Sequence, residues 1–67
     1  MNLKDHFFIT FDKSIVLVKP KSTEAISWWD VNVDPECPKH EKFFAVERNY
    51  FTAIMDGFTH AWENQLV

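Results

Sequence analysis

Residues 6–19 carry a pattern typical of a β-hairpin. Two runs rich in aromatic and β-branched residues, 6–11 and 15–19, flank the polar segment Asp12-Lys13-Ser14. A three-residue loop would place one set of side chains on a common face: Phe7, Ile9, Phe11, Ile15 and Leu17. Phe8, Thr10, Val16 and Val18 would then lie on the other face. A two-residue loop would shift this pairing, and because no glycine fixes the turn type, the register stays open.

Residues 28–33 alternate between apolar and polar positions. Trp29, Val31 and Val33 would share one face of an extended segment. Before them, residues 20–27 begin with a proline, which cannot donate to a β-ladder, and hold Ser22 and Thr23, either of which could cap a short helical turn. The alternation predicts a third strand at 28–33.

The C-terminal half has the periodicity of an amphipathic helix. Asp34-Pro35-Glu36 is a typical helix start, with an N-cap, a first-turn proline and an acid near the helix N-terminus. At 100° per residue the apolar positions fall within one arc of about 200°. They are Phe43, Phe44, Val46, Tyr50, Phe51, Ile54, Met55, Phe58, Ala61, Trp62 and Leu66. The apolar positions keep the same helical phase from Phe43 to Leu66, and this favours one continuous helix that spans residues 35–66. A strand at 42–47 followed by a helix capped by Asn49 is the main alternative.

Together these elements predict an α+β fold in a single domain covering residues 1–67. We expect an antiparallel hairpin or three-stranded meander with one long C-terminal amphipathic helix packed on the sheet. Gly57 lies inside the predicted helix, where glycine costs about 1 kcal/mol relative to alanine. A kink or a close contact is therefore expected at this position.

The size and charge of the chain limit what it can do. A domain of 67 residues buries only about 60% of its unfolded surface, and with one cysteine it cannot form an internal disulfide. The net charge of −3 and the lack of a basic stripe argue against direct nucleic-acid binding. No apolar run approaches the ~20 residues of a membrane span. A lone thiol and an N-terminus unlike a secretory signal lead us to expect a cytoplasmic protein.

The width of the apolar arc is the main functional hint. A helix packed on one sheet needs an apolar stripe of about 100°, so this helix has more apolar surface than three strands can cover. We expect this uncovered apolar surface to pack against a second copy in a homodimer or against another protein. The residues predicted for this interface are Phe44, Phe51, Met55, Phe58, Trp62 and Trp28. Alternatively, the N-terminal tail or the 20–27 connection covers the surplus. The hairpin face with Phe8, Val16 and Val18 is a second candidate surface.

No residue pattern predicts catalysis or a bound cofactor. Cys37, His40 and Glu41 lie close in sequence, but a zinc site needs about four ligands and no paired spacing supplies the rest. A thiolate near a helix N-terminus can have a lowered pKa, which would make Cys37 reactive. No nucleophile–His–acid spacing is present, and Gly57 alone cannot form a phosphate-binding loop. We therefore expect no catalytic residues, no metal and no cofactor.

The function predicted from the sequence is that of a small non-enzymatic protein-interaction module. It would be a self-associating accessory regulator or inhibitor that acts through an exposed apolar helix face. The alternative is an acidic inhibitor that mimics DNA and blocks a nucleic-acid-binding protein. Its phosphate surrogates would be Asp34, Glu36, Glu41, Asp56 and Glu63.

Overall fold

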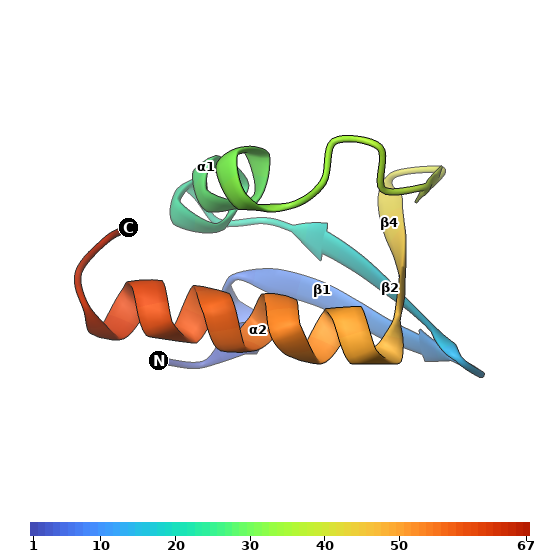
Figure 1. Ribbon diagram of the computed structural model, residues 1–67, viewed down its shortest axis with the longest axis horizontal. Coiled ribbons are helices and arrows are strands. Elements are labelled where there is room, and N and C mark those ends of the chain that lie inside the picture. Colours follow the sequence, from blue (N-terminus) through green and yellow to red (C-terminus); the bar gives the residue numbers. More distant parts are fainter.

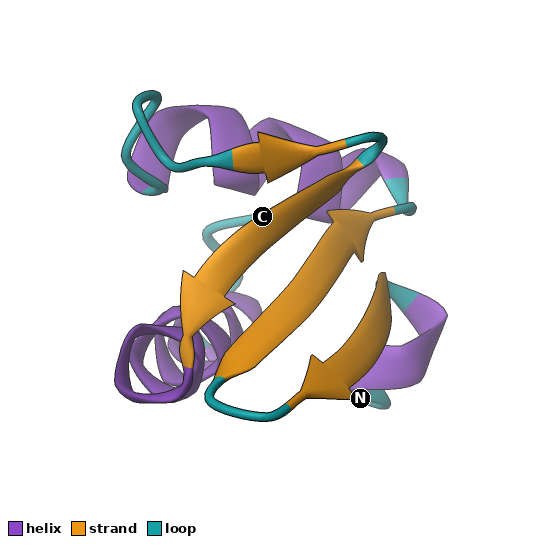
Figure 2. Ribbon diagram, turned by 90° about the vertical axis from the view of Figure 1, so that its right-hand side faces the viewer, coloured by secondary structure: helices purple, strands orange, loops and turns teal.

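Four antiparallel strands and two helices make up the chain (Figure 1). The computed structural model describes residues 1–67, apart from the side chain of His40. In chain order the elements are a 3-10 turn η1 (Leu3–Asp5), β1 (Phe7–Asp12), β2 (Ile15–Pro20), α1 (Thr23–Asn32), β3 (Lys39–His40), β4 (Phe43–Glu47) and α2 (Arg48–Glu63). The sheet order is β1-β2-β4-β3. Both helices cover one face of the sheet, as seen in Figure 2. The predicted α+β class, with the C-terminal helix packed on an antiparallel sheet, is confirmed.

The β1–β2 hairpin is confirmed, but its register is that of a two-residue loop. Asp12 pairs with Ile15, and Lys13 takes the positive φ of 56° that the tight turn requires. The three-residue loop is therefore wrong, and a register shift of one residue reverses the face of every β2 side chain. Val16 and Val18, rather than Ile15 and Leu17, lie buried on the same face as Phe7.

The predicted strand at 28–33 is wrong, because these residues belong to α1 and its end. The Ser22 hydroxyl caps this helix by accepting a hydrogen bond from the Ala25 N–H at 3.0 Å. Ala25, Trp29 and Val33 are buried at a spacing of four residues, which is the period of a helix face. Val31, which alternation placed beside Trp29, is 83% exposed. The apolar–polar alternation at residues 28–33 therefore arises by chance within a short helix, whose buried residues are four positions apart.

The C-terminal helix is confirmed, but its predicted start at residue 35 is wrong, and the alternative with a strand at 42–47 is closer. Residues 43–47 form β4, which pairs with β2 through Val16–Val46 and Val18–Phe44. The helix α2 begins at Arg48, after an N-cap at Glu47 that makes no side-chain cap bond. Asp34 starts a turn instead of a helix, since its carboxylate accepts from the Glu36 N–H at 2.9 Å. Strand positions two apart fell inside the helical arc, so periodicity could not separate the two elements.

The core lies between the sheet and the two helices. Phe58 of α2 is fully buried, and its ring meets those of Phe7, His6 and Trp28 at centroid distances of 5.0, 5.3 and 5.4 Å. The radius of gyration is 11.1 Å, close to the value of about 11 Å expected for a compact domain of this length. Within the residues described, neither helix has the length and apolar character needed to cross a bilayer.

Candidate interaction surface

The residues predicted for the interface lie mostly inside the protein. Met55 and Phe58 are buried in the core, so they do not form an exposed helix face. The other four predicted residues are partly buried and packed against the core: Phe44, Phe51, Trp62 and Trp28. Three ring contacts explain the difference, because Trp28 of α1 packs on Phe58, His6 packs on Trp62, and Phe11 of β1 packs on Phe51. Most of the expected surplus of apolar surface on α2 is therefore covered by the chain itself, while Tyr50 remains 39% exposed.

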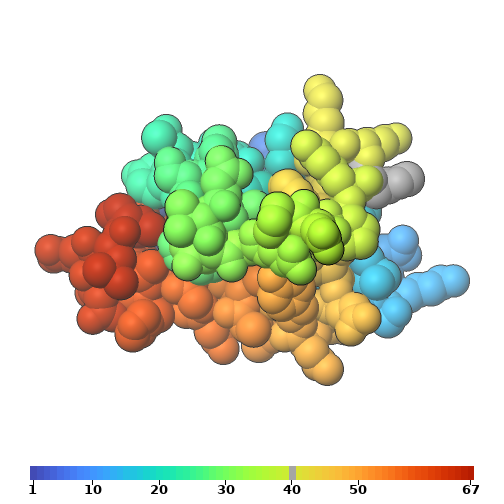
Figure 3. Space-filling view, turned by 45° about the horizontal axis from the view of Figure 1, so that its top comes forward, coloured from blue at the N-terminus to red at the C-terminus, as the bar shows by residue number. Residues whose placement is uncertain are grey.

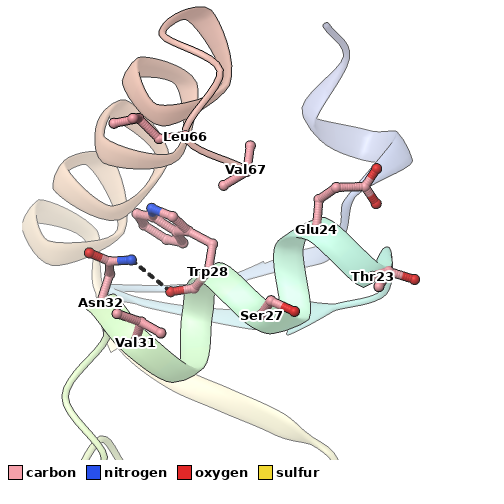
Figure 4. Close-up of a pocket in the computed structure, with 8 residues that line it drawn as sticks. All are labelled: Thr23, Glu24, Ser27, Trp28, Val31, Asn32, Leu66 and Val67. Carbon is pink, nitrogen blue, oxygen red and sulfur yellow. Dashed lines mark hydrogen bonds between the residues drawn. The ribbon is translucent and has the colours of Figure 1, made fainter.

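The helix layer instead leaves an apolar pocket between α1 and the C-terminal turn. This pocket has a volume of about 400 Å³. Its lining residues, drawn in Figure 4, are Thr23, Glu24, Ser27, Trp28, Val31, Asn32, Leu66 and Val67. Val31 and Leu66 are 83% and 70% exposed and lie on either side of the Trp28 indole in this view. Of the predicted interface residues, only Trp28 is part of this pocket.

Trp28 is held in place by the helix it crosses. Its ring packs edge-on against Phe58 and passes over Gly57, where a Cβ atom would lie only 3.2 Å from Trp28 Cζ2. The close contact expected at Gly57 is thus present, and it lets the indole approach the backbone of α2. At the end of α1 the Asn32 amide donates to the Trp28 carbonyl at 2.9 Å (Figure 4). The indole is therefore a fixed floor for the pocket.

The second wall of the pocket comes from the way α2 ends. Gln65 adopts a φ of 57°, and the N–H groups of Gln65 and Leu66 donate to the carbonyls of Trp62 and Ala61. These two bonds form a Schellman motif, which reverses the chain after a helix. The reversal brings Leu66 and Val67 back toward α1, so the red C-terminal residues lie against the green helix in Figure 3.

The pocket is built for apolar contact with a polar rim. Trp28, Val31, Leu66 and Val67 supply its apolar surface, and Glu24 supplies the one charged side chain among its lining residues. Such a site can bury an apolar side chain of another molecule and place a basic group beside the carboxylate. Val31, Leu66 and Val67 are not among the site residues predicted from the sequence. The helical spacing of Ala25, Trp29 and Val33 would have revealed Val31, because it places Val31 on the outer side of α1.

The predicted acidic face is divided among several elements. Asp34 and Glu36 line a second groove of about 610 Å³, together with Glu47, Cys37 and Tyr50. Glu41 lies in the turn between β3 and β4, and Asp56 and Glu63 lie two helical turns apart on α2; none of these three lines that groove. The structure therefore brings together only two of the five predicted acids.

Cys37 is not an activated thiol. Burial, and to a smaller extent the negative charge of Asp34, raise the pKa of the Cys37 thiol above its usual value. The prediction of a lowered pKa is wrong because residues 35–38 form a turn and no helix begins there. The neutral thiol donates weakly to the Ala45 carbonyl, with a distance of 3.7 Å from Sγ to the oxygen. A neutral, partly buried thiol is a poor nucleophile.

Among the side chains described, no three His, Cys, Asp or Glu residues are grouped so that they could hold a metal ion. The sequence cluster of Cys37, His40 and Glu41 includes the His40 side chain, which lies outside the described part.

Comparisons of the chain with protein-family models, with curated proteins and with solved structures find no match.

Proposed function

We propose that the protein is a non-enzymatic interaction module and that its pocket at Trp28 accepts an apolar side chain of a protein partner. The observation that carries this proposal is the convergence of three exposed aliphatic residues on one fixed indole. Exposed apolar surface of this kind is uncommon on soluble monomers unless it serves binding. The protein would act as an accessory regulator or inhibitor of the partner that it captures.

The physical properties of the pocket fit a protein ligand. Tryptophan is enriched at binding hot spots because a rigid ring buries much area at little entropic cost. Burying one apolar side chain contributes about 1.5–3 kcal/mol, so one anchor alone gives weak binding and flanking contacts are needed. Glu24 at the rim favours a partner with a basic residue beside its apolar anchor.

Selection of peptides from a random displayed library tests this proposal across many candidate partner sequences at once. The immobilised full-length chain should enrich peptides with an apolar anchor. Val31→Glu places a charge in the pocket wall and should weaken their binding at least about tenfold, the loss of roughly 1.4 kcal/mol. Ala53→Glu, a matched change at an exposed position of α2, should leave binding unchanged.

Two results would contradict the proposal: failure to enrich any peptide, or peptides that bind the Val31→Glu variant as well as the original chain.

The salt dependence of binding distinguishes the apolar interaction module from the acidic inhibitor. Apolar binding should change little up to about 0.5 M salt. Binding that salt abolishes, and that is lost on Asp34→Asn and Glu36→Gln, would favour the acidic inhibitor instead.

Self-association remains part of the proposed function, although it can no longer depend on the inner face of α2. The apolar groups left at the surface of the sheet supply the alternative. Phe8 and Phe11 of β1 are 48% and 57% exposed. Light scattering across a concentration series should show a species larger than the monomer, and a monomer throughout would contradict this part of the proposal.

A further inference from the structure

The two edges of the sheet differ in how they are protected against pairing with another strand. At one edge β3 has only two residues, follows Pro38 and includes Lys39. Short length, proline and lysine are the usual means by which proteins protect an edge. At the other edge β1 has six residues, Phe7–Asp12, without lysine or proline, and Figure 2 shows no strand beyond it, only the η1 turn beside its start. This edge has none of those three protections.

The backbone groups that β1 turns outward can be identified from the hairpin register. Residues of an antiparallel strand alternate between those bonded to the neighbour and those that point away from it. The His6 carbonyl accepts a hydrogen bond from the Lys21 N–H at 2.8 Å. The even-numbered residues of β1 are therefore the ones whose backbone groups bond to β2. The outward N–H and C=O groups are therefore those of Phe7, Ile9 and Phe11. The backbone bonds of η1 are internal to Asn2–His6 and leave these groups unpaired.

We propose that β1 pairs antiparallel with β1 of a second copy, with Ile9 opposite Ile9. The inference rests on the self-association in the proposed function and names its surface. When the pairing is centred on Ile9, each of the three outward residues lies opposite an outward residue of the second copy, because Phe7 then faces Phe11 of that copy. Centring one residue away, on Phe8 or Thr10, matches only two of them.

The edge pairing would join two four-stranded sheets into one sheet of eight strands. It uses the backbone edge and leaves the helix layer free, so each copy keeps its Trp28 pocket accessible. The open sheet faces would become continuous across the junction. On that face Phe8 of one copy would lie opposite Thr10 of the other, beside the partly exposed Leu17. A dimer of this form presents two partner-binding pockets.

Amide hydrogen exchange on the unmodified protein tests the inference directly. The amides of Phe8 and Thr10 should be protected at all concentrations, because they bond within the hairpin. The amides of Ile9 and Phe11 should become protected only as the protein is concentrated from about 10 μM to about 500 μM and the dimer forms. Sedimentation of the same samples reports the dimer independently.

N-methylation of Ile9, introduced by chemical synthesis, removes the central outward donor and keeps the side chain. It should raise the dimer dissociation constant at least about tenfold, since each dimer loses two hydrogen bonds. N-methylation of Asn2, exposed and outside the strand, should have no effect. A dimer whose Ile9 and Phe11 amides exchange freely would overturn the edge pairing and leave self-association through another surface. A monomer at all concentrations would overturn both.

Discussion

Phe58 on the inner side of α2 and Val31 on the outer side of α1 are both apolar, yet one is buried and the other is exposed. Phe58 on α2 is enclosed by aromatic rings from β1 and α1, whereas Val31 on α1 is 83% exposed beside the C-terminal turn. The sequence pattern points to α2 because its apolar positions are bulky and regularly spaced. The comparison shows that the spacing of apolar residues along the sequence predicts which of them could be buried on one face. The neighbouring elements of the fold determine which of them remain exposed.

Alanine substitutions on the two helices should give the largest contrast. Phe58→Ala leaves a cavity among packed rings and should lower the free energy of unfolding by about 3–5 kcal/mol. Val31→Ala removes an exposed side chain and should change it by less than about 0.5 kcal/mol. Urea denaturation followed by circular dichroism measures both values. Equal losses for the two variants would show that Val31 is buried in solution.

Loss of the N-cap of α1 should have a smaller effect. The Ser22 hydroxyl accepts from the Ala25 N–H and also lies 2.7 Å from Nδ1 of His6, which is only 8% exposed. Ser22→Ala should therefore lower the free energy of unfolding by about 2 kcal/mol, from the lost cap and an unpaired buried imidazole. Thr23→Ala, at an exposed neighbouring position, is the control. If both variants unfold like the original chain, α1 is not anchored at Ser22.

Substitution of Gly57 should on average destabilise less than Ser22→Ala and tests the contact between the two helices. Leucine here would push the Trp28 ring away, and overpacking of about 1–3 kcal/mol would be partly offset by about 1 kcal/mol of helix propensity. Gly57→Ala needs only a small shift of a half-exposed ring and should be close to neutral. The indole N–H resonance of Trp28 should move more in the leucine variant. An unchanged resonance in both would contradict the Gly57–Trp28 contact.

Local sequence signals predicted the parts of the fold that depend on neighbouring residues. The hairpin, the class and the C-terminal helix followed from β-branched runs and from helical periodicity. The hairpin register did not follow, because Lys13 takes a left-handed φ that a glycine would have signalled. The strand β4 was hidden because Phe44 and Val46, two apart, fit a helix arc as well as a strand face.

The candidate site was less predictable because it is made by tertiary contacts. Trp28 could be singled out from its type alone. Val31 joins it only because α1 is a helix, and Leu66 joins only because Gln65 reverses the chain after α2. A Schellman turn is usually announced by glycine, and glutamine gives no such signal.

The central claim, that Trp28 forms the floor of a partner-binding pocket, is tested most directly by its indole N–H resonance. The chain has three tryptophans, and therefore three such resonances. On titration with a selected peptide, the resonance of Trp28 should shift and that of the buried Trp29 should stay nearly fixed. A peptide that binds while the Trp28 resonance remains in place would show that binding occurs elsewhere.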